Sequence, residues 1–327
     1  EKIYNHSILS PLVESSSQKR SQVKPVRKVA IATILVISLN LLTFGAEAKS
    51  VIGGGRLDEQ GVIVNSVEGD GISAPPSTSA LSYLVADFES GEILAAKNPH
   101  KKLPPASTLK TLTALTLLPR INMNKSYKAS WRESSTIGNK VGLWKNRKYK
   151  VRDIWYGLML HSGNDAGVAL ANMSGGIKKT SKLMLAKARS IQAYDTIPKS
   201  PHGLDTPGQV SSAYDLALIA RAAMKNKTFR KIVATKTYIF PNTGPRNKDR
   251  KIRNLNKMLF TYPGVIGVKT GYTTKGRNTY IGIAERDGRV VIITFMHLRY
   301  GRDELAKKLF DWGFEAIGNL EPVGELV

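Results

Sequence analysis

Cysteine is absent from this chain of 327 residues, and histidine occurs only five times. Without thiols, the sequence excludes disulfides and thiolate metal sites. The histidines are scattered and form no H-E-x-x-H pair, so we expect neither a bound metal nor a cofactor. Hydrophobic residues make up 42% of the chain, which is typical of a globular protein with one or two domains.

The N-terminal apolar run, at residues 29–44, falls short of the roughly 20 residues that a membrane-spanning helix needs. Basic residues precede the run, and Ala46-Glu47-Ala48 follows it as an A-x-A cleavage site. We therefore predict a basic tail at residues 1–28 and a signal peptide or signal-anchor at 29–48. Cleavage would give a secreted protein, and an uncleaved segment would anchor it. In both cases the rest of the chain is predicted to be extracytoplasmic, in the cell envelope.

Acidic residues are few, with 25 against 49 basic ones, and the net charge is +24. Residues 1–48 hold six basic and three acidic groups, so the remainder stays near +21. Such an excess attracts anionic partners. No nucleic-acid-binding motif accompanies it, so we expect anionic envelope polymers or lipids rather than nucleic acid. The alternative is a charge that serves only solubility.

Residues 49–80 predict a flexible linker, because glycines, prolines and a Ser/Thr cluster occur there without a sustained period. The domain that follows is predicted to span residues 81–318, with a short tail at 319–327. Strand patterns lie at both of its ends and helical patterns in its middle. We therefore expect an α/β protein of the α+β type, with an antiparallel sheet flanked by helices and a helical subdomain.

Individual elements follow from the same periodicities. Strands are predicted as a hairpin across residues 83–96 and as three segments at 265–269, 279–285 and 290–297. Asp287-Gly288 would join the last two in a tight turn. Helices are predicted at residues 108–118, 151–160, 166–173, 214–224 and 303–314.

Three short motifs occur in one order: Ser107-Thr108-Leu109-Lys110, Ser162-Gly163-Asn164 and Lys269-Thr270-Gly271. Each is weak alone, since residues 16–19 also fit the first pattern and residues 38–40 the second. Those duplicates fall in the predicted tail and signal, where no active site could assemble. The ordered set is much more specific, and it can build a serine acyl-transfer site that needs no histidine.

Ser107 is the predicted nucleophile. A serine hydroxyl reacts poorly at neutral pH unless a base lies within hydrogen-bond reach. Lys110 lies one helical turn further on, and burial beside other cations would lower its pKa enough for this role. The alternative is that Ser107 only caps a helix and that Lys110 is a surface lysine.

Ser162 and Asn164 follow an apolar segment and flank a glycine that permits a tight turn. Ser162 is predicted to relay the proton to the leaving amine, and Asn164 to hold an amide of the substrate. The alternative for this motif is an ordinary helix cap.

Lys269 comes at the end of a predicted strand, where its charge would lower the pKa of a neighbouring lysine and attract a substrate carboxylate. Thr270 could hydrogen-bond that carboxylate, and Gly271 would let the substrate backbone approach the strand edge. The amides of Ser107 and Tyr272 are candidates for the oxyanion hole. His202, in Pro-His-Gly-Leu, is more simply interpreted as a structural turn histidine than as a base.

The chain around these motifs resembles a known family, the penicillin-binding D-alanyl-D-alanine carboxypeptidases of bacterial cell-wall metabolism. The similarity covers residues 80–318 and is carried by LPPASTLKTLTAL at 103–115, LMLHSGNDA at 158–166, PHGL at 201–204 and YPGVIGVKTGYT at 262–273. It departs from the family at Ser200, where Asn is frequent, and at Gly167, where Ala is frequent.

The resemblance implies a β-lactamase/transpeptidase-like fold and an acyl-enzyme mechanism. Ser107 would attack the penultimate D-alanine carbonyl of a peptidoglycan stem peptide ending in D-Ala-D-Ala, release D-alanine and pass the acyl group to water. β-Lactam antibiotics would act as covalent inhibitors. The roles that the residues suggest for Lys110, Ser162, Asn164, Lys269 and Thr270 agree with those of the family.

Three alternatives remain. A β-lactamase of the best-known class uses a Glu between the second and third motifs, and no Glu occurs between Asp165 and Val268. A transpeptidase would share every site residue and differ only in the acceptor of the acyl group. A non-catalytic wall-binding protein would be expected to have lost motif residues, and all of them are present.

Overall fold

The computed structural model describes residues 51–65, 72–241, 244 and 248–327. The predicted basic tail and export signal lie outside these residues.

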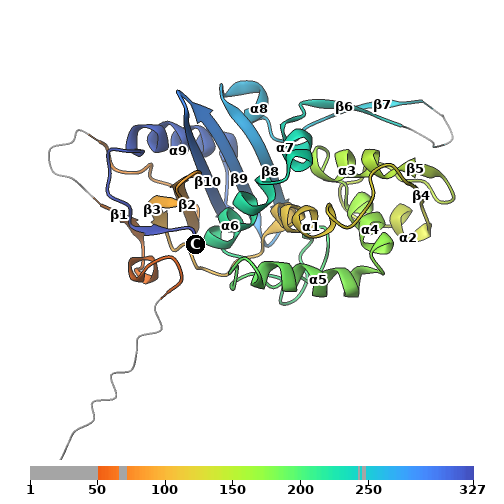
Figure 1. Ribbon diagram of the computed structural model, residues 1–327, viewed down its shortest axis with the longest axis horizontal. Coiled ribbons are helices and arrows are strands. Elements are labelled where there is room, and N and C mark those ends of the chain that lie inside the picture. The colour runs from red at the N-terminus through yellow and green to blue at the C-terminus, as the bar shows by residue number, and fades with distance from the viewer. Residues whose placement is uncertain (1–50, 66–71, 242–243, 245–247) are drawn as a thin grey trace, which may run out of the picture. The chain divides into compact units, whose positions relative to one another are not determined.

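A seven-stranded antiparallel sheet forms one half of the fold (Figure 1). Its order is β1-β3-β2-β10-β9-β8, and β11 also pairs with β3. The strands are β1 (Val62–Val64), β2 (Ser82–Asp87), β3 (Glu92–Lys97), β8 (Val265–Thr273), β9 (Arg277–Arg286), β10 (Arg289–Leu298) and β11 (Gly324–Glu325). The pairing of β2 with β10 joins strands from the two ends of the domain, with Val85 opposite Ile293. The predicted antiparallel sheet is thereby confirmed.

Helices pack against both faces of this sheet, and successive side chains of a strand point alternately into the two cores. Tyr83 and Val85 of β2 point into a core shared with α9 (Arg302–Ala316), where Phe310 is fully buried. Leu84 lies on the opposite face, in the core that includes α6 (Ala213–Met224). Period-two alternation in a strand buried on both sides therefore places the sheet between two helical layers.

The helical half comes between β3 and β8 in the sequence, as predicted. Ser107 lies in a 3₁₀ turn, η2 (Ala106–Leu109), which leads into α1 (Lys110–Leu117). The other helices between β3 and β8, besides α6, are α2 (Trp131–Ser134), α3 (Val151–Met159), α4 (Asn164–Met173), α5 (Ile177–Arg189), α7 (Lys227–Ala234) and α8 (Met258–Thr261). A short 3₁₀ helix, η1 (Gly55–Asp58), precedes β1. The predicted helices at 151–160, 166–173 and 214–224 correspond to α3, α4 and α6.

Several short elements occur in segments that show no hydrophobic period. The stretch predicted as a linker contains η1 and β1, which bury Leu57 and Ile63 against the sheet, and the predicted tail contains β11. Two strand pairs were also not predicted, because their segments show no alternating pattern: β4 (Ser126–Lys128) with β5 (Lys148–Lys150), and β6 (Thr237–Phe240) with β7 (Arg250–Arg253). Strands of two to four residues are too short to show an alternating pattern.

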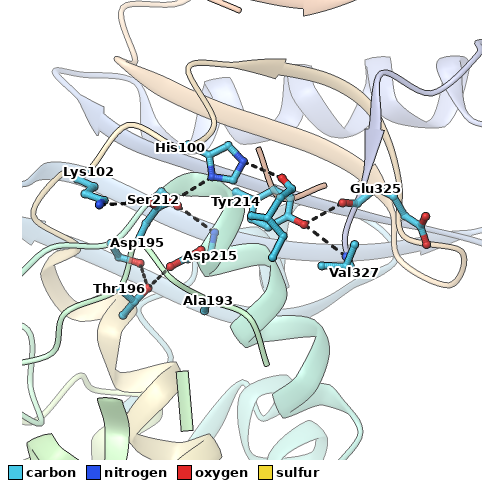
Figure 2. Close-up of polar contacts among 12 residues, drawn as sticks. His100, Lys102, Ala193, Asp195, Thr196, Ser212, Tyr214, Asp215, Glu325 and Val327 are labelled. Atoms are coloured by element: carbon cyan, nitrogen blue, oxygen red, sulfur yellow. Dashed lines mark hydrogen bonds and ion pairs between the residues drawn. The ribbon is translucent and has the colours of Figure 1, made fainter. Parts of the chain in front are cut away.

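A polar cluster, called the seam cluster below, joins the helical half to the sheet and to the C-terminal strand (Figure 2). Its members are His100, Asp195, Thr196, Tyr214 and Asp215. The Nδ1 atom of His100 lies 2.8 Å from Oδ2 of Asp195, and the Thr196 hydroxyl donates to Asp215 Oδ2 at 2.6 Å. The Tyr214 hydroxyl donates to the carbonyl of Glu325 in β11 at 2.9 Å. These polar contacts hold together segments that are far apart in the sequence.

Candidate active site

Ser107 lies in the tight turn between β3 and α1, on the wall of an open cleft. The preceding residue, Ala106, has a positive φ of 50°, and a Cβ on Gly203 would come within 1.9 Å of the Ala106 carbonyl oxygen. The turn therefore requires a glycine at position 203, in the Pro-His-Gly-Leu segment. Backbone strain of this kind is typical of functional sites.

Lys110 is fully buried beside Ser107, and its amine hydrogen-bonds to three oxygen atoms. Its Nζ lies 2.9 Å from the Ser107 hydroxyl, 2.8 Å from Oδ1 of Asn164 and 2.6 Å from the His202 carbonyl oxygen. Burial holds the pKa of Lys110 well below that of an ordinary lysine, and the charge of Lys269 lowers it further, while Asp165 opposes the shift. The predicted Ser–Lys contact is therefore formed, and its amine has a pKa well below that of an ordinary lysine.

The second motif sits between α3 and α4. Ser162 has a positive φ of 59° and lines the cleft, whereas Asn164 is buried. A Cβ on Gly163 would come within 2.9 Å of the Val141 side chain, so the position between Ser162 and Asn164 requires a glycine. Asn164 donates from Nδ2 to the Ile137 carbonyl at 2.9 Å while its Oδ1 accepts from Lys110. Both ends of the Asn164 amide are thus used inside the protein.

Asp165, directly after the motif, fixes the loop that faces it. Its carboxylate accepts hydrogen bonds from the amides of Val141, Gly142 and Leu143 at 2.8 to 3.0 Å. This loop brings Asn139 to the cleft wall. Asp165 lies outside the three motifs, so only the fold reveals this role.

The third motif lies on β8, at the edge of the sheet. Lys269 is buried, its Nζ donates to the Thr270 carbonyl at 2.8 Å, and burial together with Arg302 lowers its pKa to about 7. A Cβ on Gly271 would come within 2.8 Å of the Ser107 amide nitrogen. The strand can approach the nucleophile this closely only because residue 271 is a glycine.

The three motifs enclose one cleft of about 290 Å³. Of the predicted site residues, Ser107, Ser162, Thr270, Gly271 and Tyr272 line it. The other three, Lys110, Asn164 and Lys269, are buried, and Lys110 and Asn164 are joined to the cleft residues by the contacts given above. The cleft also contains four residues that sequence reasoning missed: Asn139, Leu255, Lys257 and Arg302. None belongs to a motif, so only the fold reveals them.

His202 does not act as a base toward Ser107. Its contact with Lys110 is through the backbone carbonyl, and its ring Nδ1 accepts from the Leu204 amide at 3.3 Å. Burial and the neighbouring Lys110 lower the pKa of His202 to about 3, so the ring is neutral at physiological pH. The structure thus agrees with a turn histidine. Within the described residues, no cluster of three or more His, Asp or Glu side chains could hold a metal ion.

Comparisons with known proteins agree with this geometry. A sequence profile of the D-alanyl-D-alanine carboxypeptidase family matches residues 70–299. The chain is 40% identical over 258 residues to D-alanyl-D-alanine carboxypeptidase DacB2 of Mycobacterium tuberculosis, covering 77% of this chain and 87% of that protein. It is 29% identical to DacF of Bacillus subtilis, over 87% of this chain and 70% of the relative.

Solved structures give the same result. A D-alanyl-D-alanine carboxypeptidase from Mycobacterium tuberculosis superposes with a TM-score of 0.73 at 39% identity, covering 78% of this chain and 98% of that one. The DD-transpeptidase of Streptomyces K15 superposes with a TM-score of 0.71 at 28% identity, covering 74% and 99%. The β-lactamase/transpeptidase-like fold is confirmed, and the chain belongs to the D-alanyl-D-alanine carboxypeptidase family of serine peptidases.

Proposed function

We propose that this chain removes the terminal D-alanine from peptidoglycan stem peptides through an acyl-enzyme on Ser107. The observation that carries the proposal is the contact of 2.9 Å between the Ser107 hydroxyl and the buried amine of Lys110. A lysine that lacks a carboxylate partner and has a depressed pKa can accept the serine proton.

The residues of the cleft can carry out each proton transfer that the reaction needs. As Ser107 Oγ bonds to the penultimate D-alanine carbonyl carbon, Lys110 takes the hydroxyl proton, and the amides of Ser107 and Tyr272 stabilise the oxyanion. Ser162, on the cleft wall, passes a proton to the leaving nitrogen as the C–N bond breaks, and the proton held by Lys110 replaces it, which leaves both residues as they began. Water then attacks the ester, returns the proton to Ser107 and releases the shortened peptide.

The roles of the remaining residues follow from their positions. Because both ends of the Asn164 amide are engaged inside the protein, we assign it the positioning of Lys110 in addition to the predicted contact with substrate. Thr270 and Arg302 line the cleft and can bind the terminal carboxylate, with Lys269 adding positive charge from beneath.

Stem peptides lie outside the cytoplasm, so the family's substrate implies an extracytoplasmic enzyme. We propose that residues 29–48 direct export, as an A-x-A-terminated apolar segment after basic residues suggests. Within the described ranges, no helix has the length and apolar character needed to cross a membrane. The positive charge supports attraction to anionic components of the envelope.

The test is intact mass over time after mixing the full chain with benzylpenicillin. A lasting adduct with the mass of the whole antibiotic is expected, because opening the β-lactam ring releases no leaving group. Ser107→Ala should form none. An adduct that clears rapidly as penicillin is consumed would indicate a β-lactamase, and no adduct would refute the assignment of Ser107.

A second assay separates hydrolysis from transpeptidation. Transpeptidation is tested because the fold is also similar to that of the Streptomyces K15 DD-transpeptidase. A peptide ending in D-Ala-D-Ala is supplied with and without an amine acceptor such as glycine. Release of D-alanine with the shortened acid as the main product supports a carboxypeptidase. A dominant amide product would make the chain a transpeptidase.

A further inference from the structure

The part of the chain around the β4–β5 hairpin has an extreme charge imbalance. Residues 120–153 contain ten Lys and Arg residues but only two acids, Glu133 and Asp153. Both acids are buried and occupied: Glu133 accepts from Ser130, Tyr127 and Asn172, and Asp153 accepts from Tyr238. The exposed surface of this region therefore has no carboxylate of its own.

The strand register concentrates the positive charge on one face. Lys128 of β4 lies directly opposite Lys148 of β5, and Lys150 lies two residues further along β5 on the same side. All three are exposed, whereas Tyr149 between them is buried and stacks with Phe240 of β6. Like charges directly opposite each other destabilise a hairpin. Within the described residues, none of these lysines has an ion-pair partner that relieves the repulsion.

Exposed aromatic side chains accompany the lysines. Trp131 is 66% exposed and Trp144 is 47% exposed, although tryptophan is generally well buried. Both lie in the connection between β4 and β5, where the Ala129 carbonyl accepts from the Asn146 amide at 2.7 Å. This bond closes the loop two residues from each tryptophan. Figure 1 shows β4, β5 and α2 at the end of the helical half that is remote from the seven-stranded sheet.

We propose that this surface, defined as Lys128, Lys148, Lys150, Trp131 and Trp144, binds the face of an anionic phospholipid bilayer. Ammonium groups on a hairpin whose own segment, residues 120–153, exposes no carboxylate match lipid phosphates. Indole rings favour the headgroup level, where one edge is apolar and the other is hydrated. A soluble polyanion would account for the lysines but would leave the two exposed indoles without a role. The proposal is independent of the catalytic assignment.

The structure provides its own reporter for a test. Of the four tryptophans, Trp155 and Trp312 are buried and belong to the two cores, so a change in emission on binding reports Trp131 and Trp144. Residues 1–50 contain no tryptophan, so insertion of the apolar segment does not itself give this signal. The full chain is titrated with phosphatidylglycerol vesicles and, separately, with phosphatidylcholine vesicles.

A blue shift with phosphatidylglycerol alone is expected, and added salt should weaken it. The triple variant Lys128→Glu, Lys148→Glu, Lys150→Glu should bind at least about tenfold more weakly. The matched control reverses three exposed lysines on and beside α7, at Lys225, Lys227 and Lys231, with the same change in net charge. It should retain the blue shift and most of the affinity.

Three results would overturn the proposal. The first is the absence of a blue shift with anionic vesicles. The second is an equal loss of affinity in both triple variants, which would mean that net charge alone drives binding. The third is binding to soluble polyglycerol phosphate as tight as that to vesicles and abolished by the β4–β5 variant, which would make the surface a polymer site. Trp131→Phe and Trp144→Phe then identify which indole carries the shift.

Discussion

The catalytic cleft and the seam cluster both bury ionisable side chains, but they treat them in opposite ways. In the cleft, Lys110 and Lys269 are buried without an ion pair anywhere in the described ranges, and burial lowers the pKa of both. In the seam cluster, Asp195 has His100 at 2.8 Å and Lys102 at 3.6 Å. Those contacts lower its pKa despite its burial.

The difference shows which region serves chemistry and which serves the fold. A lysine without an anionic partner costs stability, but its lowered pKa supplies an amine that loses its proton more readily than an ordinary lysine does. A paired Asp and His hold the helical half to the sheet and have no reactive role. Buried charge alone therefore does not identify an active site in this protein, whereas buried charge left unpaired beside a serine does.

Replacing Lys110, the unpaired lysine beside Ser107, should have the largest effect. Lys110→Met keeps the volume and removes the amine, so acylation of Ser107 by benzylpenicillin should slow by about 10³-fold. Circular dichroism should show a folded protein, because the change also removes a buried cation. Lys182→Met, on the exposed side of α5, serves as the control and should acylate at the original rate. Residual acylation within tenfold of the original would assign the base elsewhere.

Gly271 tests whether the close approach of β8 to the nucleophile matters. A Cβ at this position would come within 2.3 Å of the Thr279 hydroxyl and 2.8 Å of the Ser107 amide. Gly271→Ala should therefore slow acylation by about 10²-fold and destabilise the fold by about 2 kcal/mol. Gly55→Ala is the matched control, since nothing lies within 4 Å of its added Cβ. Unchanged acylation kinetics in Gly271→Ala would contradict the proposed site geometry.

The pH profile separates the two cleft lysines. Activity should rise as Lys110 loses its proton, at a pH well below the pKa of an ordinary lysine. It should fall again as Lys269, with a pKa of about 7, loses the charge that attracts the substrate carboxylate. Between pH 7 and pH 9, kcat/KM for a peptide acid should drop by about tenfold. The corresponding peptide amide lacks the carboxylate and should show no such fall; a fall of equal size would exclude this role for Lys269.

Much of the site could be predicted because the motifs carry their own spacing. Ser107 and Lys110 are one turn apart in the chain, so local structure alone brings them together. The alternation in β2, β8, β9 and β10 likewise predicts a sheet with strands from both ends of the domain. The resemblance of the flanking residues to a known family then fixed which fold joins the three motifs.

The remaining features depend on contacts that no local pattern encodes. Arg302, at the start of α9, lines the cleft although α9 follows β10, which β9 separates from β8. Asn139 lines the cleft on the loop that Asp165 holds. The double use of the Asn164 amide likewise follows only from the positions of Lys110 and Ile137. The β4–β5 hairpin, with Lys on both sides of Tyr149, has too few apolar residues to predict a strand.

Asp215 of the seam cluster has a raised pKa, so its contribution to stability depends on pH in the opposite sense to that of Asp195. Burial raises its pKa from 3.8 to about 7, and its Oδ1 has no hydrogen-bond partner, which suits a protonated carboxyl. A folded-state pKa above the unfolded value means that this group stabilises the fold most below about pH 4 and loses that contribution as the pH rises through 7. Asp215→Asn stays neutral, so its stability relative to the original should rise by about 2 kcal/mol between pH 5 and pH 7.5 in urea melts. The exposed Asp58→Asn is the control and should show no such trend. A pH-independent difference for Asp215→Asn would mean that Asp215 is charged in the folded protein, and that the seam cluster, like the cleft, tolerates an unpaired buried charge.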